Sequence, residues 1–285
     1  MLIAERAGVR AQRSLGCPGT CAMARESAIR IGVFAGVLGA LALAEVVWPR
    51  RQRTLARVER WPHNLALVAV GTLAIRVVAP ASVATAAEVT RRRGWGLLRL
   101  AGAPGVVAWS VSVLALDLAV YAQHVLMHKV AWLWPLHRVH HADVDVDATT
   151  GVRFHPLEYL LSLGLKGGVV VVLGAPVGAV ILFEVLLNAT SMFNHANLRL
   201  PEAVDRVVRL LLVTPDMHRV HHSVDRHEAD SNYGFNVPWW DRLFGTYRGQ
   251  PRDPHEAMTL GVPTFREARE QRLDKLLMQP FRDDC

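Results

Sequence analysis

Long apolar stretches alternate with short arginine-rich or polar segments along this chain of 285 residues. Residues 31–48, 65–87 and 106–127 form the first three stretches, each about long enough for a helix to cross the hydrocarbon core of a bilayer. Trp48, followed by Pro49 and two arginines, is typical of the point where a membrane helix reaches the headgroups. The pattern therefore predicts an all-α fold, an integral membrane helical bundle.

A fourth apolar stretch, residues 157–194, is interrupted by residues that disfavour helix. Two glycines stand at 167–168, and a Gly-Ala-Pro sequence stands at 174–176. These interruptions predict two short legs joined as a helical hairpin. A hairpin returns the chain to the side of the membrane that it left, so groups before and after it can meet in one site. A single crossing would hold those groups about 30 Å apart.

The chain divides into segments by composition. The arginine-rich start lacks the apolar run of a signal peptide, and either Met1 or Met23 could be the true first residue. Near the other end, residues 259–279 are expected to form a surface helix. The expected segments are a disordered leader at 1–30, N-terminal membrane helices at 31–110, a histidine-rich domain at 111–250 and a polar C-terminal tail at 251–285.

The net charge of +7 comes almost entirely from arginine, because the chain has only three lysines. The arginines lie at the ends of apolar runs, which fits anchoring to anionic headgroups. A nucleic-acid-binding protein would carry a basic stripe interleaved with exposed aromatic residues, so nucleic acid is not an expected partner. The three cysteines lie near the termini and exclude a disulfide framework.

Histidine is the compositional anomaly, since ten of the thirteen histidines lie between residues 124 and 222. On a helix, residues three or four positions apart share a face, with Cβ atoms about 5–6 Å apart, so two imidazoles can reach one metal ion. Two adjacent imidazoles can serve neighbouring ions about 3.5–4 Å apart. A lone histidine is more often a packed or surface residue, but clusters in an apolar chain predict a dinuclear site. The clusters are His124-His128, His137-His140-His141 and His218-His221-His222.

The ligand type narrows the choice of metal. Sites made of imidazole alone suit iron, copper, zinc or nickel, and no thiolate cluster favours zinc or an iron–sulfur centre. The sequence has no HExxH, GxSxG or glycine-rich phosphate motif, so it lacks the signatures of a metalloprotease, a serine hydrolase and a nucleotide-binding protein. Iron is favoured by elimination.

The three histidine boxes, in this order and around apolar segments, resemble those of the fatty acid hydroxylase/sterol desaturase superfamily. Segments 153–158, 194–197, 232–234 and 240–247 agree with this resemblance, which runs from about residue 117 to 247. It implies a catalytic domain at 111–250 with two iron ions that use O2 as co-substrate. One oxygen atom would enter water while a lipid C–H bond is hydroxylated or desaturated. The chain has no cytochrome b5 haem signature, so the resemblance implies a separate electron donor of the ferredoxin or cytochrome type.

Metal-bound imidazoles usually donate their other N–H group to a carboxylate or carbonyl, and Asp117 is the stronger candidate for such an acceptor because it lies within an apolar span. Asp143, Asp145 and Asp225 are further candidates, or else loop and capping carboxylates. The resemblance assigns the metal ligands, residue by residue. His195 is the natural ninth ligand and His155 a tenth, unless His155 only begins a helix before Pro156. The expected ligands are His124, His128, His137, His140, His141, His155, His195, His218, His221 and His222.

Location and function remain expectations at this stage. Five arginines between residues 50 and 60 predict that this end faces the cytoplasm, which puts the histidine site in a cytoplasmic helical cap of a multi-pass cell-membrane protein.

The leading function is oxidation of a membrane lipid, whether a sterol, a fatty acyl chain, a carotenoid or an alkylglycerol. A metal-binding or transport protein is the alternative, although it would need polar residues distributed through several spans. A hydrolytic dimetal enzyme would need a general-base glutamate beside the ligands.

Overall fold

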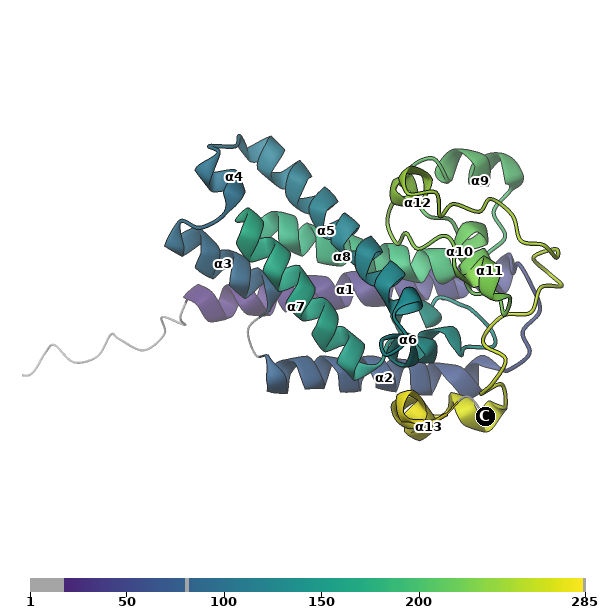
Figure 1. The fold of residues 1–285 in the computed structure, drawn as a ribbon. Coiled ribbons are helices and arrows are strands. Elements are labelled where there is room, and N and C mark those ends of the chain that lie inside the picture. The colour runs from purple at the N-terminus through teal and green to yellow at the C-terminus, as the bar shows by residue number, and fades with distance from the viewer. Residues whose placement is uncertain (1–17, 80–81, 284–285) are drawn as a thin grey trace, which may run out of the picture.

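A computed structural model describes residues 18–79 and 82–283 of the chain. Within these ranges the fold is all-helical and has no strand, only two isolated β-bridges (Figure 1). The long helices are α1 (Pro18–Val47), α2 (Arg57–Val78), α3 (Val83–Arg93), α5 (Gly105–Lys129), α7 (Pro156–Leu173) and α8 (Val177–His195). The short elements are α4 (Leu97–Leu100), α6 (Trp134–His141), η1 (Thr150–Val152), α9 (Glu202–Val208), α10 (Pro215–His221), α11 (Arg226–Ala229), α12 (Trp239–Leu243), η2 (Ala268–Gln271), α13 (Leu273–Met278) and η3 (Gln279–Phe281).

Five helical segments are long and apolar enough to cross a membrane. Many of their large apolar side chains face outward; Leu43, Leu73 and Val172, for example, are each at least 58% exposed. Such a surface is unfavourable in water and suits contact with lipid tails. The expectation of an all-α multi-pass membrane bundle is confirmed. The five segments are Ala28–Val47, Arg57–Leu100, Gly105–Lys129, Pro156–Leu173 and Val177–His195.

Helices α7 and α8 form the expected hairpin. Gly174 ends α7 in the left-handed conformation, with φ of 70°, and Pro176 precedes α8. A Cβ on Gly174 would lie 2.6 Å from the carbonyl oxygen of Trp95, so the position requires glycine. The glycines at 167–168 were expected to interrupt the first leg, but α7 runs through them without a break. Glycine inside a helix costs only about 1 kcal/mol, which is too little by itself to end a helix.

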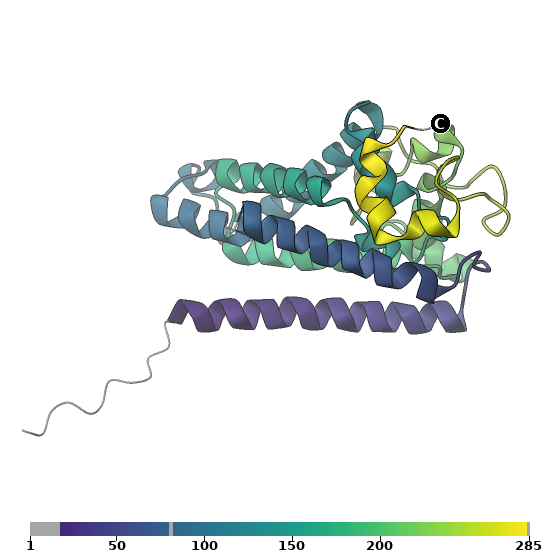
Figure 2. The same ribbon diagram turned by 90° about the horizontal axis from the view of Figure 1, so that it is seen from below.

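Two expectations for the N-terminal half need correction. The helix α1 begins at Pro18, so residues 18–30 are helical and not part of a disordered leader; residues 1–17 lie outside the described ranges. Residues 65–87 were expected to form one span, yet α2 ends at Val78 and α3 begins at Val83. Ala79, which ends α2 outside helical geometry, precedes a proline in the sequence, and a proline disfavours helical geometry at the residue before it. Helix α1 lies along the outside of the bundle, where it packs against α8 (Figure 2).

Apart from α4, which lies at the other end, the short helices labelled in Figure 1 gather at one end of the bundle and form a cap. The C-terminal segment belongs to this cap, since Leu276 is fully buried against Leu67 of α2 and Val139 of α6. It is therefore a packed part of the fold, although its composition had suggested a polar tail. The surface helix expected at 259–279 is reduced to η2, α13 and the first residue of η3. Gly261, with φ of 99°, starts an irregular stretch before them.

Candidate metal centre

Nine buried histidines gather in two adjoining groups inside the cap. Within each group, one ring nitrogen from every histidine lies within 4.8 Å of the others. None of these side chains is more than 2% exposed. The first group is His124, His128, His137, His141 and His221, and the second is His140, His195, His218 and His222.

The HxxHH boxes divide between the groups as their spacing predicts. In α6, His140 points into the second group and His141 into the first. At the end of α10, His221 joins the first group and His222 the second. The rings of His141 and His222 stack with centroids 4.4 Å apart, so the two groups share a boundary. This arrangement suits two neighbouring metal ions, one in each group.

The separations between ring nitrogens fit ligands around a common ion. The Nε2 atoms of His128 and His141 are 3.1 Å apart. In the second group, Nε2 of His195 lies 3.0 Å from that of His140 and 3.1 Å from that of His218. Two ligands at right angles, each about 2.1 Å from a metal, are about 3 Å apart. The geometry therefore places these nitrogens where metal ligands would be.

Oxygen acceptors fix the orientation of four of the imidazoles. A histidine that donates from Nδ1 keeps a lone pair on Nε2, which is how proteins orient metal ligands. The Nε2 atoms of His124, His137 and His221 are buried and lack a hydrogen-bond partner among the described residues. Such orphaned nitrogens fit a metal ion. The four pairs are His124 with Tyr233 O at 2.7 Å, His221 with Ser231 O at 2.7 Å, His195 with Ser191 O at 2.6 Å and His137 with Glu158 Oε1 at 2.8 Å.

Burial affects the protonation of five imidazoles of the cap. It lowers their pKa well below the usual 6.5, and the neighbouring imidazoles lower it further because a second positive charge nearby is unfavourable. Neutral imidazole is the form that binds a metal ion. The histidines outside the membrane-spanning segments that show this shift are His140, His141, His218, His221 and His222.

The segment 231–234 carries two of the carbonyl groups that orient ligands. Asn232 between them adopts the left-handed conformation, with φ of 51°, which asparagine tolerates better than most residues. Its side-chain amide donates to the carbonyl groups of Met217 and Arg248 and holds this conformation. The buried carboxylate of Asp241 accepts from the backbone N–H groups of Tyr233 and Gly234, each at 2.8 Å. Asp241 thus supports the segment that faces His124 and His221.

His155 lies outside both groups, unlike the expectation for a tenth ligand. Its Nδ1 accepts from the N–H of Leu157 and caps α7, and its Nε2 lies 3.2 Å from the carbonyl oxygen of Leu277. The residue of this helix end that does reach the site is Glu158, one turn later. A glutamate in the first turn of an apolar helix was the signal that sequence reasoning could have used.

The four aspartates proposed to support the ligands make other contacts. Asp117 accepts from Asn236 and Trp240, Asp145 from the N–H groups of Thr54 and Leu55, and Asp225 caps α11. Asp143 binds Arg60. Two carboxylates lie beside histidines of the two groups: Glu158 beside His137, and Asp230 at 3.5 Å from Nδ1 of His128.

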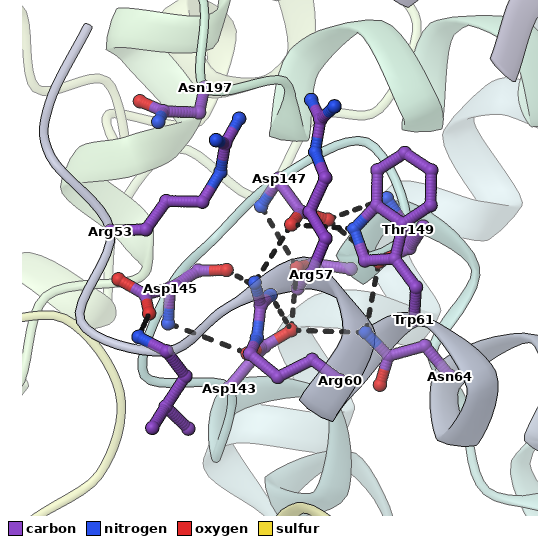
Figure 3. Close-up of polar contacts among 12 residues, drawn as sticks. Arg53, Arg57, Arg60, Trp61, Asn64, Asp143, Asp145, Asp147, Thr149 and Asn197 are labelled. Carbon is purple, nitrogen blue, oxygen red and sulfur yellow. Dashed lines mark hydrogen bonds and ion pairs between the residues drawn. The ribbon is translucent and has the colours of Figure 1, made fainter. Parts of the chain in front are cut away.

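A buried ionic network joins α2 to the loop that follows His141 (Figure 3). Arg60 donates to both carboxylate oxygens of Asp143, to Asp147 and to the carbonyl oxygen of Asp145. Burial alone would raise the pKa of Asp143, but the guanidinium groups of Arg60 and Arg153 hold it below the usual value. The network therefore ties the N-terminal membrane helices to the histidine-bearing segment.

A cavity of about 510 Å³ lies beside the first histidine group. His124, His137 and Glu158 line it, together with mainly apolar side chains from α1, α2, α5, α7 and α8. Its volume is in the range of about 300–1,000 Å³ that small-molecule sites occupy. The cavity therefore extends from the membrane-spanning helices to the candidate metal centre.

Similarity to known proteins extends over the segment that carries these histidines. The Fatty acid hydroxylase family matches residues 109–246, which include every histidine of the two groups. The chain is 29% identical over 136 residues to an ornithine lipid hydroxylase of Rhizobium tropici, which covers 48% of this chain and 40% of that protein. It is 26% identical over 168 residues to the alkylglycerol monooxygenase of Homo sapiens, and this alignment covers 57% of this chain and 36% of that protein. It is also 33% identical over 153 residues to a cholesterol 25-hydroxylase-like protein of Danio rerio. This alignment covers 52% of this chain and 59% of that protein.

The chain thus spans between 36% and 59% of the length of these three relatives. No solved structure matches it significantly. The family match, the three histidine boxes and the multi-pass helical bundle agree with one another and with the resemblance drawn from the boxes. Residues 109–246 of this chain are thus similar to the fatty acid hydroxylase family.

Proposed function

We propose that this protein is an O2-dependent membrane di-iron oxidase that hydroxylates a C–H bond of a lipid. A C–H bond and O2, with two electrons and two protons from outside the chain, give an alcohol and one water. The observation that supports this most is the pair of buried all-histidine groups, with orphaned Nε2 atoms, beside an apolar cavity. Hydroxylation is proposed over desaturation because the similar proteins are named hydroxylases and monooxygenases.

Iron is the metal proposed for both groups. Imidazole ligands alone also suit zinc, but zinc has no redox chemistry and could not take part in the reduction of O2. Two bound iron ions would supply that reduction and the attack on the C–H bond. His124, His128, His137, His141 and His221 would hold one ion, and His140, His195, His218 and His222 the other.

The residues of the chain have three tasks in this proposal. The carbonyl groups of Tyr233 and Ser231 and the carboxylate of Glu158 hold protons on Nδ1, so that Nε2 keeps its lone pair. Burial of every ligand keeps bulk water away from the reacting atoms. The apolar cavity holds a lipid chain next to His124 and His137.

An electron donor is proposed as a separate protein of the ferredoxin or cytochrome type. The capped end, where the ligands lie, is proposed to face the cytoplasm, because it carries the arginines between residues 50 and 60. A reporter enzyme fused after α13 would test this orientation, since α13 lies at the capped end (Figure 1). Activity of a reporter that works only outside the cytoplasm would contradict it.

The alternative of a metal carrier without redox catalysis lacks support from the geometry. The histidines of the two groups lie together in the cap rather than along a path through the spans. The test is O2 consumption by the purified protein in lipid nanodiscs, with reduced ferredoxin as donor and total lipid extract as substrate. We expect O2 uptake together with lipid products heavier by one oxygen atom. Iron-loaded protein that uses no O2 would contradict the proposal, and products lighter by two hydrogens would identify a desaturase.

A further inference from the structure

One carboxylate oxygen beside the candidate metal centre has no hydrogen-bond partner among the described residues. Glu158 accepts from Nδ1 of His137 through Oε1, at 2.8 Å, while its Oε2 is buried and unpartnered. Glu158 is only 5% exposed, and it lines the apolar cavity. A buried carboxylate oxygen without a donor is unfavourable, because it has lost its hydration and gained nothing in return. Oxygen Oε2 is therefore suited to a donor on a molecule in the cavity.

The cavity surface next to Glu158 is polar as well. Ser162 follows Glu158 by one helical turn on α7, so the two side chains share a face of the helix. The hydroxyl group of Ser162 lies 2.6 Å from Nε2 and 2.9 Å from Oε1 of Gln123 on α5. Both residues line the cavity, and Gln123 directly precedes His124 in the chain. An amide nitrogen carries two N–H groups, so Gln123 can contact Ser162 and also donate to a molecule in the cavity.

The polarity of the cavity limits the kind of molecule that fits it. Most of the other lining side chains are apolar, with Phe34, Val68 and Leu187 among them. A matching molecule has a long apolar part and, next to His137, a group that donates one hydrogen bond and accepts another. A hydroxyl group and a secondary amide meet this requirement, whereas an ether oxygen only accepts.

We propose that Glu158 determines substrate specificity, with Oε2 accepting a hydrogen bond from a hydroxyl or amide N–H group of the lipid. This inference rests on the proposed function, because the bound donor group would hold its neighbouring C–H bonds beside the candidate metal centre. Gln123 would donate to the oxygen of the same group. A site built to bind a donor discriminates against an analogue that lacks it, since its own polar atom is then left unpaired. Lipids without a donor near the oxidised carbon would therefore bind less tightly.

Lipid binding without turnover tests this inference independently of the oxidase activity. Radiolabelled hexadecanol is bound to the purified protein in phosphatidylcholine nanodiscs under argon, with no electron donor. Two pairs of competitors differ in that a methyl group replaces the donated hydrogen: hexadecanol and hexadecyl methyl ether, and N-methylpalmitamide and N,N-dimethylpalmitamide. We expect the donor of each pair to bind at least about tenfold more tightly, as hydrogen bonds to a charged group allow. The tighter of the two donors identifies an alcohol or an amide lipid as the source, and equal affinities within both pairs would overturn the inference.

The variant Glu158→Gln distinguishes hydrogen bonding from packing. Glutamine can still accept from His137 through Oε1, but it presents N–H groups in place of Oε2, and these donate to alcohol and ether alike. We expect the preference for hexadecanol over its methyl ether to fall from about tenfold to nearly none. Asn188→Leu is the matched control, because Asn188 lines the same cavity but its amide donates to the carbonyl oxygen of Glu184 in its own helix. A preference that persists in Glu158→Gln, or that disappears in Asn188→Leu, would overturn the inference.

Photolabelling of the unaltered protein gives an answer even if Glu158→Gln loses its metal. A hexadecanol with a diazirine beside the hydroxyl group loses N2 on illumination and forms a bond to the nearest side chain. Trypsin then separates Glu158, in the peptide 154–166, from Glu184, in the peptide 167–199. We expect the label on Glu158, and label on Glu184 instead would overturn the inference. Selective binding without any O2 consumption would refute the oxidase and leave this site intact, whereas O2 consumption without selective binding would do the reverse.

Discussion

Arg60 and Asp143 form a buried, two-point ion pair, with Nε and Nη2 of the guanidinium each 2.7 Å from a different carboxylate oxygen. Both side chains are fully buried. Arg60 belongs to α2, outside the segment that matches the family, whereas Asp143 follows directly on the second histidine box. The N-terminal helices therefore help to hold the histidine-bearing loop in place. The candidate metal centre is therefore expected to depend on residues well before residue 109.

Loss of the Arg60 side chain should therefore disturb the metal centre from a distance. Removing one partner of a buried ion pair leaves an uncompensated charge and costs about 3–5 kcal/mol. We expect Arg60→Met to lower the thermal unfolding midpoint and to reduce the bound iron per chain. Arg76→Met, in the same helix but exposed, should change neither quantity. Equal iron content in both variants, measured by elemental analysis, would show that the ion pair does not position the loop.

Glu158 should control the affinity of the first histidine group for metal. Its Oε1 lies 2.8 Å from Nδ1 of His137 and fixes the direction of the ring. Loss of such a partner typically reduces metal affinity about 10–100-fold. We expect this range for Glu158→Ala, measured by competition with a chelator. Asp225→Ala is the control, because Asp225 caps α11 and contacts no ligand; an equal loss there would argue against a specific role for Glu158.

Asp241 should act on the ligands through the backbone. Its carboxylate accepts from the N–H groups of Tyr233 and Gly234, and the carbonyl of Tyr233 in turn faces His124. Asp241→Ala leaves two buried N–H groups without an acceptor, each costing about 1–3 kcal/mol. We expect lower stability and a changed spectrum of the bound metal, since the ring of His124 loses its orientation. Asp274→Ala, at an exposed position of α13, should leave the spectrum unchanged.

His255 should make the cap sensitive to acid. Burial lowers the pKa of His255 from 6.5 to about 4, and the nearby carboxylate of Asp216 does not fully offset this effect. A histidine whose pKa is depressed in the folded state stabilises the fold fully above the unfolded value, and this stability is lost as the pH falls from about 6.5 towards about 4. We expect His255→Gln to flatten the dependence of the unfolding midpoint on pH in that window. An unchanged slope would assign the acid sensitivity to other groups.

The sequence was sufficient to predict the membrane bundle, the hairpin and the gathering of histidines from the three boxes. Apolar length predicts a span, and histidines three and four residues apart share a helix face, so both follow from local spacing. The stacking of His141 on His222 depends on how α6 and α10 pack. The predicted hairpin nevertheless brings the two boxes to the same side of the membrane, where they can meet.

The partners of the ligands could not be predicted in the same way. Three of the four acceptors that hold Nδ1 are backbone carbonyl groups, which every residue carries and no motif marks. Asp143 seemed suited to support a ligand because it follows His141, but its carboxylate binds Arg60, 83 residues earlier in the chain. His155 lies within a segment that resembles the family, but its ring caps α7. Long-range packing decides such contacts, and a single sequence does not contain it.

The most direct test of the account is the metal content of the purified, folded protein, measured by elemental analysis together with Mössbauer spectroscopy. The two histidine groups predict two iron ions per chain, close enough to be magnetically coupled. Replacing His195 by alanine should reduce this content, whereas replacing His155 should not, because only His195 belongs to a group. One iron per chain, uncoupled iron, or zinc in both groups would contradict the proposed di-iron oxidase.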